Sequence, residues 1–124
     1  MSIVRIDHVN IAAEPSILER CRKFYVEVIG LVEGFRPPLS SRGHWLYAGD
    51  YAVVHLTETG TEGAGGVSGL LNHYALECDD GAAIIARLDA LKVSYEVTRV
   101  PSSNRMQVFL HDPAGIGIEL SFIT

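Results

Sequence analysis

Several features are scarce in this sequence, and each scarcity excludes a class of protein. Its two cysteines, Cys21 and Cys78, are too few for a disulfide framework, and Cys21 shares helical spacing with Leu18 and Phe24, which predicts a buried position. No apolar run approaches the roughly 20 residues that cross a bilayer. The net charge is -5 and no Lys/Arg cluster interrupts it, so a nucleic-acid partner is not expected.

The start of the chain and its composition favour a globular protein of the cell interior. The first residues, MSIVRIDHVNI, lack the basic and apolar regions of a secretory signal, which predicts a cytoplasmic location. Hydrophobic residues make up 48% of the chain and charged residues 20%. The 124 residues suit one folded domain.

The sequence repeats a short pattern in its two halves. Residues 6–11 (IDHVNI) align with residues 71–76 (LNHYAL) at an offset of 65, and residues 53–56 (VVHL) align with residues 117–120 (GIEL) at an offset of 64. The two offsets agree to within one residue, so we predict a duplicated unit.

Each half has the pattern of a helix followed by three strands. A helix begins at a Ser16–Glu19 capping box and ends at Gly30, and a second, capped by Asp79 or Asp80, carries apolar residues from Ile84 to Leu91. Strands are predicted over residues 31–35, 44–48, 51–56, 94–100, 107–111 and 115–122. The aligned segments 6–11 and 71–76 supply a first strand in each half, so the predicted fold class is α+β. The chain then consists of two βαβββ modules, residues 1–57 and 70–124, joined by a Gly/Thr-rich linker at residues 58–69.

Four ionisable residues occupy equivalent places in these strands: His8, His55, His73 and Glu119. Side chains alternate along a strand, so the apolar neighbours of each residue pack on the helix and the ionisable side chain projects from the opposite face. Burying such groups is costly unless they are paired or bind an ion. The four residues therefore predict one divalent metal site, for which Zn, Ni, Mn and Fe(II) all remain open.

The chain resembles the vicinal oxygen chelate superfamily, which includes glyoxalases, extradiol dioxygenases and bleomycin-binding proteins. The resemblance rests on IDHVNI, FYVEVIGL, VVHL, NHYAL and the closing HDPAGIGIEL. It implies paired βαβββ modules in a cup-shaped mixed sheet with helices outside, metal ligands at His8, His73 and Glu119, a small-molecule substrate and a homodimer. His55 departs from the Glu or Gln usual at its position, and the lack of basic residues after Glu119 disfavours phosphonate chemistry.

Three functions fit these residues. The first is a glyoxalase-like lyase or isomerase, in which the metal chelates two adjacent substrate oxygens and Glu119 or His55 moves a proton. The second is an Fe(II) ring-cleaving dioxygenase built on His8, His73 and Glu119. The third is a protein that sequesters a drug or metabolite without catalysis.

Other polar residues have weaker claims to the site. His44 is expected to be an exposed residue at a strand start rather than part of the cup. Arg36, Arg42, Tyr47 and Arg105 lie where they can rim the cup, but solvated loop charges are the ordinary expectation.

Overall fold

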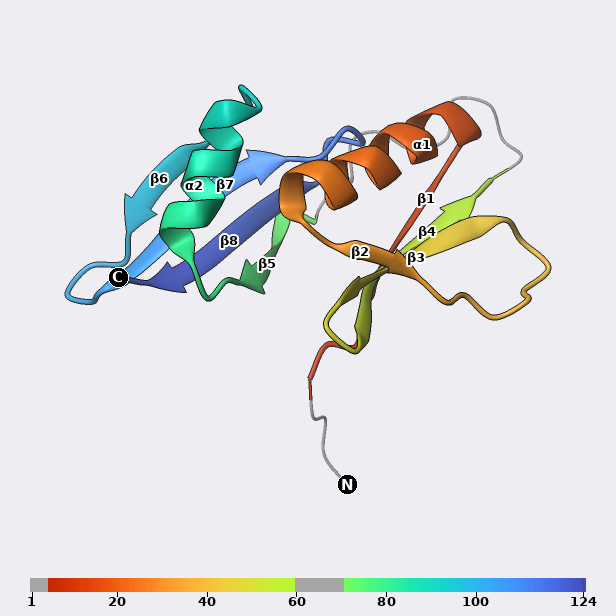
Figure 1. Cartoon of the computed structure of the whole chain (residues 1–124), viewed down its shortest axis with the longest axis horizontal. Helices are drawn as coiled ribbons and strands as arrows, with labels where there is room; N and C mark the ends of the chain where they lie inside the picture. The colour runs from red at the N-terminus through yellow and green to blue at the C-terminus, as the bar shows by residue number, and fades with distance from the viewer. Residues whose placement is uncertain (1–4, 60–70) are drawn as a thin grey trace. The chain divides into compact units, whose positions relative to one another are not determined.

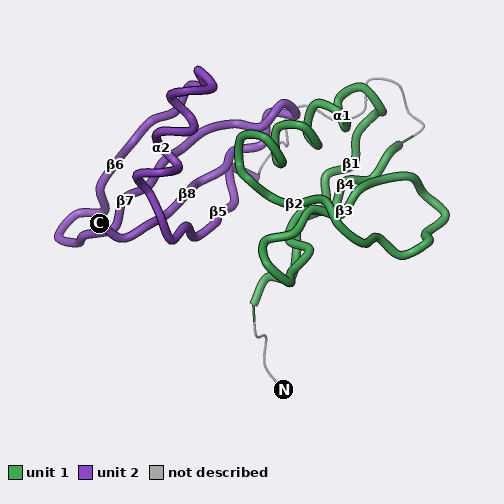
Figure 2. The backbone as a smooth tube through the Cα atoms, viewed as in Figure 1, with its two compact units in different colours: residues 1–65 green, residues 66–124 purple. Residues whose placement is uncertain are grey.

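The structure is a computed structural model that describes residues 5–59 and 71–124 (Figure 1). It divides into two compact units, residues 1–65 and residues 66–124 (Figure 2). No helix in these described ranges is long and apolar enough to cross a membrane. Most of the predicted linker lies outside the described residues.

Unit 1 is a four-stranded mixed sheet with one helix against it. Its strands are in the order β1-β4-β3-β2, with β1 parallel to β4 and the other pairs antiparallel. The elements are β1 (Val9–Ala13), α1 (Pro15–Phe24), a π-helical turn η1 (Tyr25–Ile29), β2 (Val32–Gly34), β3 (Gly43–Ala48) and β4 (Tyr51–Glu58).

Unit 2 repeats this topology. Its order is β5-β8-β7-β6, and again the first and last strands pair in parallel. The elements are β5 (His73–Glu77), α2 (Gly81–Ala90), β6 (Glu96–Arg99), β7 (Arg105–His111) and β8 (Gly117–Ile123). The α+β class and the two βαβββ modules are therefore confirmed, with strand ends that differ from the predictions by a few residues.

The start of α1 differs from the prediction. The helix begins one residue before Ser16, and its cap is Glu14, whose carboxylate accepts a hydrogen bond from the Ile17 N–H at 3.3 Å and one from the Ser16 hydroxyl. The Ser16–Glu19 capping box is wrong. Pro15 stands at the first helical position, which suits a residue without an N–H, so the cap lies two residues before Ser16. The predicted end at Gly30 is confirmed by its left-handed φ of 92°.

The apolar residues of the strands pack on the helices as the alternation predicts. Leu46, Val54 and Leu56 in unit 1 are fully buried, and Cys21 on α1 has no exposed surface. In unit 2, Val108 and Ile118 are equally buried, and Asp80 caps α2 through the Ala83 N–H. Each sheet thus has a helix-covered face and a second face, which we call the site face because it carries the candidate ligands.

A tight turn places β8 next to β7. The buried Asp112 carboxylate accepts hydrogen bonds from the Ala114 N–H at 2.8 Å and the Ile116 N–H at 2.9 Å, while Gly115 takes a φ of 86°. This turn is the DPAG string of the sequence, and it fixes the register in which Phe109 lies opposite Glu119.

Candidate functional site

Strand register puts the candidate residues of each unit on one face at equivalent places. In unit 1, Val9 pairs with Val54, so His8 precedes that pair and His55 follows it on the neighbouring strand. In unit 2, His73 pairs with Gly117, and Glu119 lies two residues further along β8. The prediction that each first-strand histidine shares a face with the last-strand candidate of its own half is confirmed.

In unit 1 three rings from adjacent strands form a stack. The His8 and His55 ring centroids are 3.8 Å apart with an interplanar angle of 11°, and Trp45 lies on the other side of His55 at 4.0 Å and 10°. Trp45 is the register partner of His55 on β3. The neighbouring strand spacing of about 4.8 Å brings such side chains into contact.

In unit 2 an imidazole meets a carboxylate. His73 Nε2 lies 3.2 Å from Glu119 Oε1, and the His73 ring makes an edge contact with Phe109 at 5.5 Å and 83°. Glu119 is only 9% exposed. A Cβ at Gly117 would come within 2.4 Å of the Asn72 carbonyl oxygen and 2.9 Å of His73 Cβ. A glycine at this position therefore leaves the space that the Asn72 carbonyl group and His73 occupy.

Both first-strand histidines are oriented by the residue before them. His8 Nδ1 lies 2.7 Å from Asp7 Oδ2, and His73 Nδ1 lies 2.6 Å from Asn72 Oδ1. An ionised carboxylate and an amide oxygen only accept, so each Nδ1 donates and Nε2 is left with its lone pair. Metal-binding histidines are held in this way by outer partners.

Burial and charge act on the protonation of the unit 1 residues. Burial lowers the pKa of His55, and the electrostatic interaction with His8 lowers it further, which favours the neutral form that binds metals. The hydrogen bond from His8 lowers the pKa of Asp7. Both shifts suit a neutral His55 beside an ionised Asp7.

The donor set fits a divalent ion in its chemistry, and each unit supplies two donors. Two ligands at about 2.1 Å from a metal lie about 3.0–3.4 Å apart for angles between 90° and tetrahedral, a range that contains the 3.2 Å of His73 and Glu119. The His8 and His55 rings lie nearly parallel with centroids 3.8 Å apart. No three His, Cys, Asp or Glu side chains gather for a metal in the part of the chain that the structure describes.

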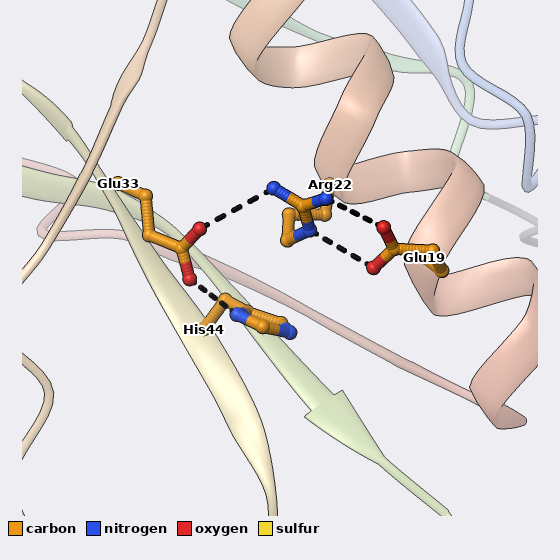
Figure 3. Close-up of polar contacts among 4 residues, drawn as sticks. All are labelled: Glu19, Arg22, Glu33 and His44. Carbon is orange, nitrogen blue, oxygen red and sulfur yellow. Dashed lines mark hydrogen bonds and ion pairs between the residues drawn. The ribbon is translucent and has the colours of Figure 1, made fainter.

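His44 lies on the other face of its sheet. Its Nδ1 contacts Glu33 on β2, and Glu33 also contacts Arg22 of α1 at 3.4 Å, while Arg22 pairs with Glu19 at 2.5 Å (Figure 3). His44 pairs with the buried Leu56 in the β-register, which places it on the helix side. This network ties α1 to the sheet and does not belong to the site face.

Four further residues were named as candidates for the rim of the cup, and they differ in exposure and contacts: Arg36, Arg42, Tyr47 and Arg105. Tyr47 covers Gly34 on the site face and donates to the Phe35 carbonyl at 2.5 Å, and Arg105 donates to Ser121 Oγ at 2.6 Å. Arg42 is exposed. Arg36 is half-buried, and its charge acts on His55.

Several residues of the site face were missed from the sequence: Asp7, Trp45, Asn72 and Phe109. The sequence repeat could have identified these residues, because Asp7 and Asn72 are 65 residues apart and Trp45 and Phe109 are 64 apart. These offsets are the same as those of the candidate ligands.

The family model described as the Glyoxalase/Bleomycin resistance protein/Dioxygenase superfamily matches residues 5–120. The chain therefore belongs to this superfamily. No curated protein matches the sequence.

Solved structures share the fold at low sequence identity. A glyoxalase family protein from Bacillus anthracis has a TM-score of 0.78 and 22% identity, with 100% of this chain and 98% of that chain covered. An antibiotic binding protein from Streptomyces sp. CB03234, TnmS3, has a TM-score of 0.70 and 22% identity, covering 100% and 99%. A variant of the fosfomycin resistance protein FosX from Listeria monocytogenes, complexed with Mn(II), has a TM-score of 0.72 and 14% identity, covering 99% and 95%.

Proposed function

We propose that this protein is a divalent-metal-dependent enzyme of the glyoxalase type, a lyase or isomerase that acts on a small substrate with two adjacent oxygens. His8, His55, His73 and Glu119 are the proposed ligands. The observation that carries the proposal is the His73 Nε2 to Glu119 Oε1 pair at 3.2 Å, with His73 Nδ1 held by Asn72. A relative with this fold is seen with Mn(II), which supports a metal of this kind.

Two donors are fewer than the three or four protein ligands of ordinary metal sites, so neither pair is sufficient by itself. The proposal therefore requires both pairs, whether one chain or two chains supply them. The homodimer that the resemblance implies and the cytoplasmic location inferred from the sequence stay predictions, and sedimentation of the purified protein tests the first.

The proposed division of work follows from burial and charge. When bound, the metal supplies a Lewis acid that stabilises an enolate or oxyanion. Glu119, a buried carboxylate 3.2 Å from His73 Nε2, is the proposed group that takes the substrate proton and returns it. His55, kept neutral by burial, is the second candidate for this proton transfer.

Metal analysis of protein purified without a histidine tag tests the proposal. We expect about one divalent ion per proposed ligand set in the wild type and little in His8→Ala and Glu119→Ala. Glu33→Ala is the matched control, because that carboxylate lies on the helix side of its sheet. Full occupancy in both site variants would overturn the metal site.

An Fe(II) dioxygenase is the second candidate, and the same ligands support it. His8, His73 and Glu119 make two imidazoles and a carboxylate, the set that suits ferrous iron and dioxygen. Iron content together with oxygen uptake on catechols distinguishes it from the first candidate, which needs neither.

Sequestration of a planar molecule is the third candidate, and the stacked rings of Trp45, His55 and His8 favour it. An aromatic array binds flat ligands without a metal. A protein that holds no stoichiometric metal, and whose His73→Ala variant binds a flat ligand as tightly as the wild type, would be assigned to this class.

A further inference from the structure

Arg36 lies just after β2, in the loop that leads to β3. Its guanidinium donates through Nη1 to the Ser41 carbonyl at 2.8 Å and through Nη2 to Ser41 Oγ at 3.0 Å. These bonds hold the Arg36 side chain in a fixed position and join the two ends of the loop between β2 and β3. Two of the five guanidinium N–H groups are used in this way.

The Nε–H of Arg36 is buried and has no hydrogen-bond partner among the described residues. A buried donor that lacks a partner costs about 1–3 kcal/mol, and more when the group is charged. No carboxylate of the described part of the chain lies within ion-pair distance of Arg36. The guanidinium therefore has an unused donor and an unneutralised charge.

Arg22, in the same unit, is an arginine whose guanidinium nitrogens all have carboxylate partners. Its Nε and Nη2 donate to the two carboxylate oxygens of Glu19, and Nη1 reaches Glu33 (Figure 3). Arg36 has only neutral acceptors, both from Ser41.

The position of Arg36 ties this unused donor to the candidate site. A Cβ at Gly43, the first residue of β3, would lie 3.1 Å from Arg36 Nη2. Gly43 stands two residues before Trp45 and pairs with Thr57, two residues after His55, so strand alternation gives this end of β3 and β4 the face of the stacked rings. A ligand bound against His55 thus has a cationic donor within reach.

We propose that Arg36 binds a carboxylate of the substrate, so that the molecule taken by this site carries a carboxylate in addition to its two adjacent oxygens. The assignment of that carboxylate to a substrate rests on the proposed function. A planar carboxylate matches the guanidinium edge that contains Nε and gains charge-assisted hydrogen bonds there. Arg36 is then a binding residue that selects anionic substrates, and it takes no part in proton transfer.

Acetate, with neutral acetamide as its matched control, is the probe. It is titrated at constant ionic strength into metal-free, ¹⁵N-labelled protein, and the Nε–H signal of Arg36, identified by its loss in Arg36→Lys, is followed by NMR. We expect a saturable shift with acetate, with a dissociation constant on the order of millimolar, and none with acetamide. A shift that grows without saturation, or an equal shift with acetamide, would overturn the proposal.

The variants separate a specific site from general charge. Acetate binding, followed by the fluorescence of the single tryptophan Trp45, is expected to weaken at least tenfold in Arg36→Gln and to change less than twofold in Arg42→Gln, an exposed arginine of the same loop. Equal losses in both variants would overturn the assignment. Thermal unfolding of Arg36→Gln checks that the Ser41 loop still folds.

Failure of this proposal is distinguishable from failure of the metal function. Saturable acetate binding by a protein that takes up no metal would support the carboxylate site and remove the metal enzyme. Metal binding that depends on Glu119, with no acetate effect at Arg36, would overturn the carboxylate site and leave the enzyme proposal standing.

Discussion

The two units carry the same site positions with different chemistry. Unit 1 places two imidazoles and an indole in a parallel stack, whereas unit 2 places an imidazole against a buried carboxylate with a phenyl edge beside them. Asp7 orients the first histidine of unit 1, and Asn72 does so in unit 2. The groups therefore lie at equivalent positions in the two units and differ in charge. Unit 2 holds the anionic candidate ligand, Glu119, and unit 1 holds the anionic orienting residue, Asp7.

The largest effect on metal affinity is expected when the carboxylate of unit 2 is removed. Glu119→Gln keeps the shape and loses the charge, and we expect metal affinity to fall about 100-fold or more, since even outer partners of a ligand are worth 10–100-fold. Competition against a chromophoric chelator measures the affinity.

The matching change in unit 1 sharpens this result. His55→Glu gives unit 1 a carboxylate at the position equivalent to Glu119, and we expect metal affinity within about tenfold of the wild type, because a carboxylate is also a good ligand. If Glu119→Gln retained wild-type affinity while His55→Glu lost it, the roles of the two units would be reversed.

The residues that orient the histidines come next. Asp7→Ala and Asn72→Ala should each weaken metal binding by about 10–100-fold, with the larger loss at Asp7 because a charged acceptor holds the imidazole N–H more strongly. The same chelator competition measures both. Asp50→Ala, in an exposed turn, is the control, and a larger loss at Asn72 than at Asp7 would contradict the prediction.

The two units differ in a close backbone contact, that of Gly117 in unit 2, which should affect their stability to substitution. Gly117→Ala should lower the free energy of unfolding by about 1–3 kcal/mol, because the new Cβ would meet the Asn72 carbonyl oxygen at 2.4 Å. Unit 1 already has a side chain, Val53, at the equivalent position, so Val53→Ala should cost less than about 1 kcal/mol. Urea unfolding measures both, and equal costs would show that the two units are packed alike at this point.

The smallest effect is expected on the helix side of unit 1. His44→Ala removes one contact of Glu33, which keeps its contact with Arg22, and partly exposed ion pairs contribute about 0–1 kcal/mol. Urea unfolding of His44→Ala should therefore nearly overlay that of His111→Ala, an exposed histidine of unit 2. A loss above 2 kcal/mol would mean that the network of Figure 3 holds α1 in place.

Strand faces were predictable because alternation has a period of two and the repeat supplied a second copy to check it. That His73 and Glu119 project away from the helix side followed from these rules, whereas the neighbouring position of β5 and β8 did not. The stacking of His55 between His8 and Trp45 did not, since ring orientation depends on side-chain rotation and not on register. The cap at Glu14 was missed because a glutamate is a less usual cap than the serine two residues later.

The parallel pairing of the first and last strands in each unit has a consequence for how the site comes into being. The residues of each candidate pair are separated by nearly the whole length of their unit, and they meet only when β4 docks beside β1 or β8 beside β5. Contacts of such long sequence separation are slow to form. Assembly of each candidate pair is thus the same event as the docking of the last strand of its unit, and a metal that needs both pairs would be taken up only after both units have completed that step.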